Sequence, residues 1–317
     1  MVKVSVIIPA RNEEEYIAAC LDSLMKQTKK PFEIVVVTNN STDKTKEIVD
    51  GYKGKGVKQI IFNGKSSAAI ARNRGARVAK GDVFFFLDAD VFCAPTLIGD
   101  IERVFSNPGV EHAVAPTVAN VNSFIQRCNE AKVSYLRRRR EAEKIVSRSV
   151  NIIRRNLFEK IGGYPEDVFY FEDRALWEEV KGYRQGDMKS TTYYNDPGTL
   201  DEFIRQAKYM GKGLSTYGLG KLLKDNPSLR IAVYSFSFIS ALLALILLLS
   251  PNRTVILGYA ALIMAVALIS YGLIRAMVYS VYSKMPLESF TWVFVLAPIR
   301  LFFMGSEYLE NKLKSQQ

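Results

Sequence analysis

Asp88 and Asp90 are the two residues whose type and spacing first suggest chemistry. They end an unbroken apolar run, Phe84 to Leu87, a pattern typical of a strand buried on both faces. Ligands of open α/β sheets bind beyond the carboxyl ends of the strands, and residues i and i+2 of an extended chain point to the same side. If the strand continues that far, the two carboxylates lie roughly 6.6 Å apart, which suits a hard divalent cation with attached phosphates. The alternative for an isolated pair of this kind is a polar loop after a strand.

A second acidic pair, Glu172 and Asp173, is flanked by aromatic residues and opens a predicted helix. Burial among aromatic side chains raises the pKa of a carboxylate and suits it to base chemistry. The only histidine, His112, lies in a strand-like stretch and is expected to be structural. Any general base must therefore come from another residue type.

Strand-like and helix-like segments alternate at short spacing before these acids. The predicted strands cover residues 4–8, 33–37, 58–62 and the run that leads to Asp88, and a helix is expected over 66–79. This alternation predicts an α/β fold with a mostly parallel, doubly wound sheet. In the less regular middle third we expect a strand at 111–116 and a long helix at 123–145.

Two long uncharged stretches lie in the last third of the chain. Residues 231–249 and 254–274 contain no charged side chain, and each is long enough to cross a bilayer as a helix. Residues 290–304 are apolar but shorter and contain Pro298 and Arg300, which favours an interfacial or re-entrant helix over a third span. The predicted division is a catalytic domain at 1–229, two transmembrane helices within 230–283, and the interfacial helix and tail at 284–317.

The net charge of +11 could indicate nucleic acid as a partner. Beside membrane spans, an anionic membrane surface and phosphate-bearing substrates explain it better, so no nucleic acid is expected. The amino terminus has no signal-peptide layout, and basic residues flank the spans on one side. The chain is therefore expected to be a multi-pass protein of the cell membrane with a cytosolic catalytic domain.

Several motifs, in order along the chain, resemble those of the family 2 glycosyltransferases, which are inverting enzymes with the Rossmann-like GT-A nucleotide-sugar fold. The resemblance covers about Val4 to Tyr209. The motifs are Ser5–Glu13, Val36–Thr45, Ala71–Gly75, Gly81–Asp90, Asn151 with Arg154, Gly162–Glu166 and Glu172–Asp173. No Q-x-x-R-W motif follows, so a processive polymer synthase is not expected.

The resemblance implies a donor site near the first motifs. Pro9, Arg11 and Glu13 would lie near the nucleotide, and Arg72 would face the nucleotide or its diphosphate, which suits a forked cation. Asp88 would contact the ribose or the metal, and Asp90 would hold Mg²⁺ or Mn²⁺ against the diphosphate.

One donor-side motif departs from the family pattern. Thr38 and Asn39 stand where two aspartates are usual. The amide of Asn39 can still hydrogen-bond a base, but the usual contact and the choice of base are open. Both UDP- and GDP-linked donors remain possible.

The resemblance also implies an acceptor side. Glu172 and Asp173 would face the acceptor, with Asp173 as the catalytic base, and Tyr164 would lie beside them. Arg205 and Lys208 offer a basic helix that either grips phosphate or anchors the chain at the membrane. Because the predicted spans hold the domain against the bilayer, the acceptor is expected to be a membrane lipid, a polyprenyl phosphate or a lipid-linked glycan.

Other functions remain as alternatives. A glycolipid or a soluble molecule could be the acceptor. A sugar nucleotidyltransferase shares the architecture but usually opens with a G-x-G-T-R loop, which residues 9–13 lack. A non-catalytic membrane scaffold is supported only by the uncharged Thr38 and Asn39. A metal-dependent shift in melting temperature with a nucleoside diphosphate would exclude it.

Overall fold

The computed structural model describes residues 1–64, 67–120, 122–131, 151–168, 172–195, 197–217, 291, 295–297 and 299–300. The chain divides into two compact units. The first comprises Met1–Val121 and Lys144–Asp196, and the second comprises Asn122–Glu143 and Pro197–Gln317. Residues 197–229, which the sequence assigns to the catalytic domain, belong to the second unit.

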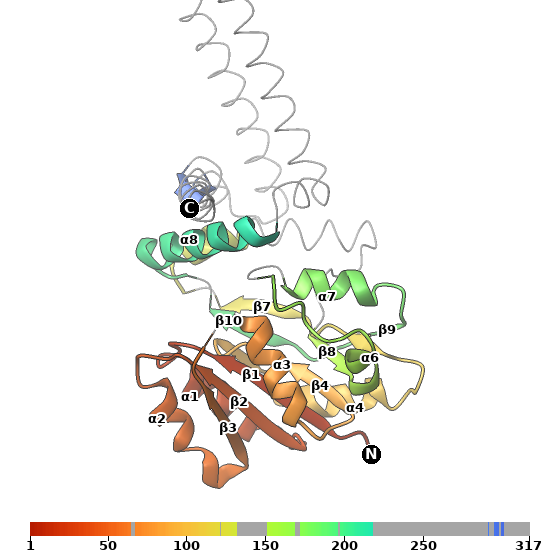
Figure 1. Ribbon diagram of the computed structural model, residues 1–317. Coiled ribbons are helices and arrows are strands. Elements are labelled where there is room, and N and C mark those ends of the chain that lie inside the picture. The colour runs from red at the N-terminus through yellow and green to blue at the C-terminus, as the bar shows by residue number, and fades with distance from the viewer. Residues whose placement is uncertain are drawn as a thin grey trace, which may run out of the picture. The chain divides into compact units, whose positions relative to one another are not determined.

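The first unit is built on a seven-stranded sheet with the order β3-β2-β1-β4-β8-β6-β9 (Figure 1). Its strands are β1 (Val4–Ala10), β2 (Glu33–Asn39), β3 (Val57–Phe62), β4 (Val83–Phe86), β6 (His112–Ala113), β8 (Ile152–Arg154) and β9 (Gln185–Gly186). The pairs among β3, β2, β1 and β4 are parallel, whereas β8 pairs antiparallel with both β4 and β6. The predicted α/β fold with a mostly parallel sheet is confirmed.

Strand β4 lies between β1 and β8, and all four of its residues are buried. A central, doubly covered strand is what its aromatic run predicts. The strand ends at Phe86, however, so Asp88 and Asp90 lie in the loop that follows it. The expectation that a continuing strand points both acids to one side is therefore wrong.

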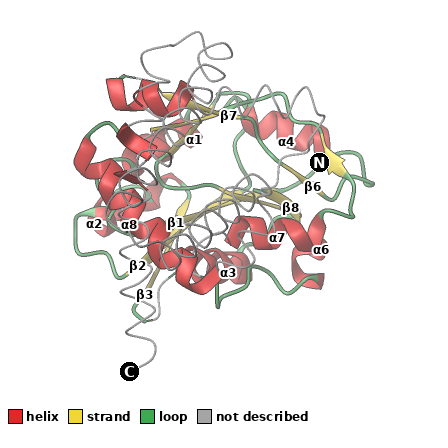
Figure 2. Ribbon diagram, turned by 90° about the horizontal axis from the view of Figure 1, so that it is seen from above, coloured by secondary structure: helices red, strands yellow, loops and turns green. Residues whose placement is uncertain are grey.

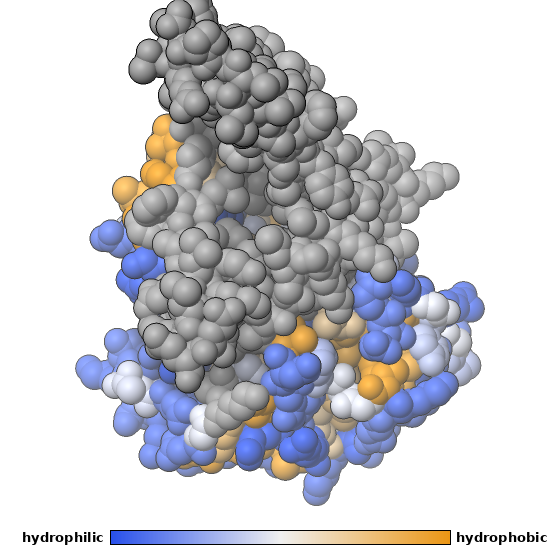
Figure 3. All heavy atoms as spheres, turned by 45° about the horizontal axis from the view of Figure 1, so that its top comes forward, coloured by the Kyte–Doolittle hydropathy of each residue, from blue (hydrophilic) through white to orange (hydrophobic). Residues whose placement is uncertain are grey.

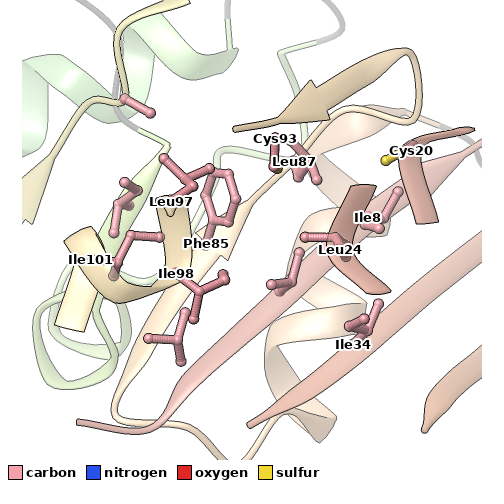
Figure 4. Packing of buried hydrophobic residues seen from close by; sticks show 14 of the residues in the cluster. Ile8, Cys20, Leu24, Ile34, Phe85, Leu87, Cys93, Leu97, Ile98 and Ile101 are labelled. Carbon is pink, nitrogen blue, oxygen red and sulfur yellow. The ribbon is translucent and has the colours of Figure 1, made fainter. Parts of the chain in front are cut away.

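Helices cover both faces of this sheet (Figure 2). Alternate strand residues supply the two apolar layers. Val6, Ile8 and Phe85 face the layer of α1 (Ile17–Met25), α2 (Thr45–Asp50) and α4 (Leu97–Phe105), part of which Figure 4 shows. Ile7, Phe84 and Phe86 face the layer of α3 (Ala68–Val78), α6 (Arg155–Lys160) and α7 (Glu172–Val180). The period-two alternation of a strand thus serves two layers at once.

Smaller elements complete the first unit. A three-stranded sheet has the order β5-β10-β7, with β5 (Val91–Cys93), β10 (Thr192–Asn195) and β7 (Thr117–Asn120), and a short helix, η1 (Lys53–Lys55), precedes β3. The strand expected at 111–116 is only β6. Its His112 is buried and its Nε2 lies 3.2 Å from the Tyr183 carbonyl oxygen, which agrees with a structural role.

The described surface is mainly hydrophilic on the face drawn in Figure 3, with small hydrophobic patches. Large exposed apolar side chains such as Ile61, Val78 and Val118 come from separate elements. Scattered residues of this kind are normal for a folded surface. The apolar side chains of this unit are thus concentrated in the two layers beside the sheet.

In the second unit the structure describes helix α8 (Leu200–Tyr217) and a small cluster of Cys128, Phe203 and Leu296. The Arg300 guanidinium lies 4.3 Å from the Phe203 ring centroid and donates to Gln206 Oε1. Within the described ranges, none of the helices combines the length and apolarity that a bilayer crossing requires. The predicted spans at 231–249 and 254–274 lie outside the described residues, as does most of the predicted interfacial helix.

Candidate active site

Two loops at the carboxyl ends of β1 and β2, residues 11–16 and 40–45, are joined by hydrogen bonds. Asn12 Oδ1 accepts from the Thr42 backbone N–H at 2.8 Å, and the Glu13 N–H donates to Thr45 Oγ1 at 2.8 Å. The Glu14 N–H donates to Asp43 Oδ2 at 3.0 Å. These bonds make one ledge, here called the donor ledge, from two loops that are about thirty residues apart.

The donor ledge brings together the residues predicted for the first donor motifs. Pro9 is half-buried on β1, Arg11 is exposed in the first loop, and Asn39 is buried at the end of β2. Asn12 and Asn40 adopt left-handed backbone conformations with φ of 56° and 48°. Asparagine tolerates this region better than most residues, so these two asparagines shape the loops.

Glu13 lies in a strongly acidic environment. Burial, then Asp90, Asp88 and Asp43, raise the pKa of its carboxyl from 4.5 to about 8. A carboxylate responds in this way when it is desolvated and like charges surround it. Glu13, Asp88 and Asp90, called the donor acids below, thus gather at one place although the strand geometry expected for them does not hold.

The loop that carries Asp88 and Asp90 is fixed from below. The Val91 N–H and the Cys20 thiol both donate to the Asp88 carbonyl oxygen, at 3.1 and 3.7 Å. Cys20 and Cys93 are buried in the apolar layer beneath this loop (Figure 4). The backbone is therefore held, while 56% of the Asp88 side chain stays exposed.

Arg72 of α3 connects Asp88 to the second acidic pair. Its Nη2 donates to Asp88 Oδ1 at 2.7 Å, and its Nη1 donates to Glu172 Oε1 at 2.5 Å. The Arg72 side chain is 9% exposed and the Glu172 side chain 13%. The resemblance predicts that Arg72 faces the nucleotide. That contact stays a prediction, because the structure shows the guanidinium engaged with two carboxylates.

Tyr164 packs beneath this ion bridge. The Arg72 guanidinium carbon lies 5.2 Å from the centroid of its ring, and the ring meets that of Phe86 edge to face at 5.0 Å. Tyr164 is buried, which is the main reason that the pKa of its hydroxyl is raised. The apolar floor and the cation–π contact both limit the motion of the guanidinium.

Asn73 is a residue of the site that sequence reasoning missed. Its side-chain amide accepts from the Tyr164 N–H and donates to the Tyr164 carbonyl, each at 2.9 Å, and it also donates to Glu166 Oε1. Gly163, with φ of 81°, leaves no room for a side chain, because a Cβ there would lie 2.7 Å from Asn73 Oδ1. The A-R-N motif contained this signal, but only its arginine was given a role.

Asp173 lies in the first turn of α7, directly after Glu172. Burial and then the charge of Glu172 raise the pKa of its carboxyl to about 6, while Arg72 and the Arg174 N–H act in the opposite direction. The flanking residues 169–171 lie outside the described part of the chain. A carboxylate with this pKa can accept a proton near neutral pH, as predicted for the base.

The donor acids fit a hard divalent cation in chemical type, because they offer only carboxylate oxygens in a region of excess negative charge. No group of three or more potential ligands that could hold a metal occurs among the residues that the structure describes. In phosphate sites, however, Mg²⁺ is usually held by one or two carboxylates and the phosphates themselves. Asp88 and Asp90 would be sufficient protein ligands for such a site.

Two predicted acceptor residues lie in the second unit. Arg205 and Lys208 are both exposed on α8, one turn apart. Their predicted role in gripping phosphate stays a prediction.

A surface hollow of about 570 Å³ lies at the amino ends of β1 and β4, away from the acids described above. Its lining includes Val2, Lys29, Asp82, Glu102 and Arg154. Lys29 pairs with Glu102 at 2.8 Å, and Arg154 donates to backbone carbonyls. Because these charges already have partners, the hollow is a poor candidate for the site.

Comparison with known proteins identifies a family for the part of the chain that carries the donor acids. Residues 5–162 match the family model described as Glycosyl transferase family 2. A poly(ribitol-phosphate) beta-glucosyltransferase of Bacillus spizizenii is 36% identical over 93 residues, which are 28% of this chain and 15% of that protein. WfaP of Escherichia coli, a UDP-Glc:alpha-D-GlcNAc-diphosphoundecaprenol beta-1,3-glucosyltransferase, is 33% identical over 144 residues, 40% of this chain and 57% of WfaP. The match thus spans less than two thirds of the length of either relative.

A solved structure shares the fold. The mannosyltransferase PcManGT from Pyrobaculum calidifontis, in complex with GDP-Man and Mn²⁺, matches 98% of this chain and 88% of its own, with a TM-score of 0.58 and 20% identity. At this identity the likeness concerns the fold alone. Together with the α/β sheet that positions the acids, it shows that the chain carries a GT-A-like domain, whose residues 5–162 match glycosyl transferase family 2.

Proposed function

We propose that the chain transfers a sugar, with inversion, from a nucleotide-sugar donor to a hydroxyl group of a membrane lipid acceptor. The observation that carries the proposal is Asp173, whose pKa is raised to about 6 and whose neighbour Glu172 is tied through Arg72 to the donor acid Asp88. A base on one side and an acid that could hold the diphosphate-bound cation on the other suit a direct displacement. The family match supports the nucleotide-sugar donor.

In the proposed reaction these residues have separate roles. Asp173 removes the proton of the acceptor hydroxyl as its oxygen attacks the anomeric carbon. The bond from that carbon to the phosphate oxygen breaks, and the nucleoside diphosphate leaves with the electron pair. One attack from the opposite side inverts the anomeric centre. Asp88 and Asp90 would hold Mg²⁺ or Mn²⁺, which when bound supplies positive charge to the leaving diphosphate.

A lipid acceptor is supported by the sequence and by one relative. The uncharged stretches at 231–249 and 254–274 are long enough to span a bilayer, which would hold the catalytic domain on the cytosolic face of the cell membrane. The name of WfaP specifies a diphosphoundecaprenol-linked acceptor. An acceptor hydroxyl needs a base, whereas a polyprenyl phosphate needs little deprotonation, so Asp173 favours a lipid-linked glycan.

Membranes that contain the protein, incubated with radiolabelled UDP- or GDP-sugars and Mn²⁺, test the proposal. We expect label in the organic extract with one donor, and none with the Asp173→Asn variant. Label that stays wholly in the aqueous phase contradicts a lipid acceptor. Folded Asp173→Asn with near-native turnover contradicts the assigned base and leaves a phosphate acceptor as the better explanation.

The nucleotide base can be found separately. Thermal-shift measurements with UDP, GDP and dTDP in the presence of Mn²⁺ should show one preferred nucleotide, because the altered Thr38-Asn39 segment lies at the donor ledge. No shift with any of them contradicts the nucleotide-sugar proposal itself.

A further inference from the structure

Arg72 makes ion pairs with both a donor acid and an acceptor-side acid. The two terminal nitrogens of its guanidinium are divided between Asp88 and Glu172. Its Nε is buried without a hydrogen-bond partner in the described part of the chain, so the terminal nitrogens make its contacts. One side chain thus joins two segments that lie 84 positions apart in sequence.

The packing around Arg72 limits the motion of this bridge between Asp88 and Glu172. Arg72 is buried on α3, a helix packed against β1 and β2, and its guanidinium lies over the Tyr164 ring. Burial opposes its charge, but Asp88, Tyr164 and Glu172 together raise the pKa of the guanidinium above its ordinary value. A planar fork can serve two carboxylates in fixed directions, which the point charge of a lysine cannot do.

The acceptor end of the bridge is the first turn of α7. Glu172 and Asp173 are adjacent there, and the next residues of the helix are packed into the apolar layer through Leu176 and Val180. Because the two residues are adjacent in one helical turn, a displacement of Glu172 also displaces Asp173. We propose that Arg72 is a positioning residue that ties the loop of Asp88 to the start of α7 and so holds Asp173 at a fixed place relative to the donor.

The inference rests on the proposed function and adds a role that the resemblance does not imply. If Arg72 instead binds the diphosphate directly, its loss weakens nucleotide binding. If Arg72 positions Asp173, its loss leaves nucleotide binding nearly intact and lowers turnover, because a misplacement of about 1 Å at a reacting group can cost about 100-fold in rate. The two roles therefore differ in the quantity that changes.

The test compares Arg72→Met and Arg72→Lys in the full-length protein with Arg77→Met as the matched control. Arg77 lies on the same helix and also makes an ion pair with a distant acid, Glu166, at 3.4 Å. Its side chain, however, is 68% exposed. Arg72→Met leaves Glu172 without its partner and could unfold the site. The double variant Arg72→Met/Glu172→Gln removes that unpaired charge and still lacks the ion bridge between Asp88 and Glu172.

For Arg72→Met and the double variant we expect kcat to fall ~100-fold, with less than about threefold change in the Kd of the nucleoside diphosphate with Mn²⁺, a factor worth only ~0.65 kcal/mol. Arg72→Lys should recover part of the loss, and Arg77→Met should behave as wild type. A rise of tenfold or more in Kd with unchanged kcat overturns the proposal in favour of diphosphate binding.

The pH profile adds a readout that a merely structural role would not move. The charges around Asp173 are those of Glu172 and Asp88, which raise its pKa, and that of Arg72, which lowers it. Arg72→Met should therefore move the acidic limb of kcat/KM to higher pH. In the double variant, which loses one charge of each sign, the limb should move less. An unmoved limb in Arg72→Met contradicts the assigned contact.

Hydrogen–deuterium exchange makes the test independent of turnover. Loss of the tie should speed exchange in the peptide that covers α7 for Arg72→Met and the double variant but not for Arg77→Met. If the wild-type protein transfers no sugar, the proposed function is wrong. The exchange measurement still shows whether Arg72 holds the start of α7 in place. Unchanged α7 exchange in both Arg72 variants overturns the inference even if transfer is confirmed.

Discussion

The donor acids and the acceptor-side pair differ in how far neighbouring charges offset the effect of burial on the pKa values of their carboxyl groups. Glu172 and Asp173 have a protein cation, Arg72, which partly offsets the effect of burial. Around Glu13 the neighbouring acids Asp90, Asp88 and Asp43 act in the same direction as burial. Arg72 also pairs with the donor acid Asp88, but the main influences on Glu13 all raise its pKa. The donor side therefore keeps an excess of negative charge, which suits a cation that arrives with the substrate.

The comparison explains why the two groups suit different chemistry. Partial neutralisation leaves Asp173 with a pKa of about 6, low enough to be ionised at pH 7 and high enough to accept a proton. Crowded carboxylates with an excess of negative charge are instead good ligands for a hard cation. Four predictions test whether this division is real.

The largest effect is expected for Asp90→Ala, which removes a donor acid. Turnover should fall to background, because the ligand of the diphosphate-bound cation is lost. The thermal shift produced by nucleoside diphosphate with Mn²⁺ should disappear, while the melting temperature without ligand stays close to wild type. Asp187→Ala, at an exposed acid, is the control. An active, metal-independent Asp90→Ala variant would falsify the donor-side assignment.

Asp173→Asn removes the proposed base and keeps the shape of the side chain. We expect kcat to fall by ~10³, within the range for loss of a general base, while nucleotide affinity is kept. Glu179→Gln, at an exposed acid of the same helix, should retain activity. Equal losses of nucleotide affinity and turnover in Asp173→Asn would show that the two acidic groups are not functionally separate.

The acidic limb of kcat/KM should have its midpoint near pH 6 in the wild-type protein at saturating Mn²⁺. Asp173 must be ionised to act, so its activity is lost as pH falls through the raised pKa, by ~10-fold per unit below it. Initial rates between pH 4.5 and 8 measure this limb. A rate that stays flat down to pH 4.5 indicates an acceptor that needs no base.

The smallest effect concerns stability and tests the donor side without ligand. The pKa of Glu13 is higher in the folded protein than the ordinary value of 4.5, so folding favours its protonated form. This contribution is present below pH 4.5 and is lost as pH rises toward about 8. Glu13→Gln should therefore be more stable than wild type at pH 8, by on the order of 1 kcal/mol after allowance for solvent screening, and not at pH 4.5.

Denaturation of the purified full-length protein at the two pH values measures this difference. Glu47→Gln, at an exposed acid of α2, is the control and should show no such dependence on pH. Equal stabilities of wild type and Glu13→Gln at pH 8 would mean that the donor acids do not repel one another in the folded protein.

The local sequence was sufficient to predict the first four parallel strands of the main sheet and helix α3. The aromatic run of β4 and the apolar runs of β1 and β2 predicted buried strands, because such runs satisfy a sheet covered on both faces. The motifs predicted the acids of the candidate site, whose roles stay predictions. Strand ends were less certain, since β4 stops at Phe86 where the pattern allowed it to continue.

Only the tertiary structure decided which charges meet. Arg72, Asp88 and Glu172 become neighbours because α3, the end of β4 and the start of α7 converge at one edge of the sheet, and no spacing in the sequence encodes that contact. The same holds for Asn73, which binds the backbone of Tyr164 some ninety residues away. The sequence determined the residue types from local pattern, but pKa values and ion pairs depend on distances between remote segments, which arise only when the chain folds.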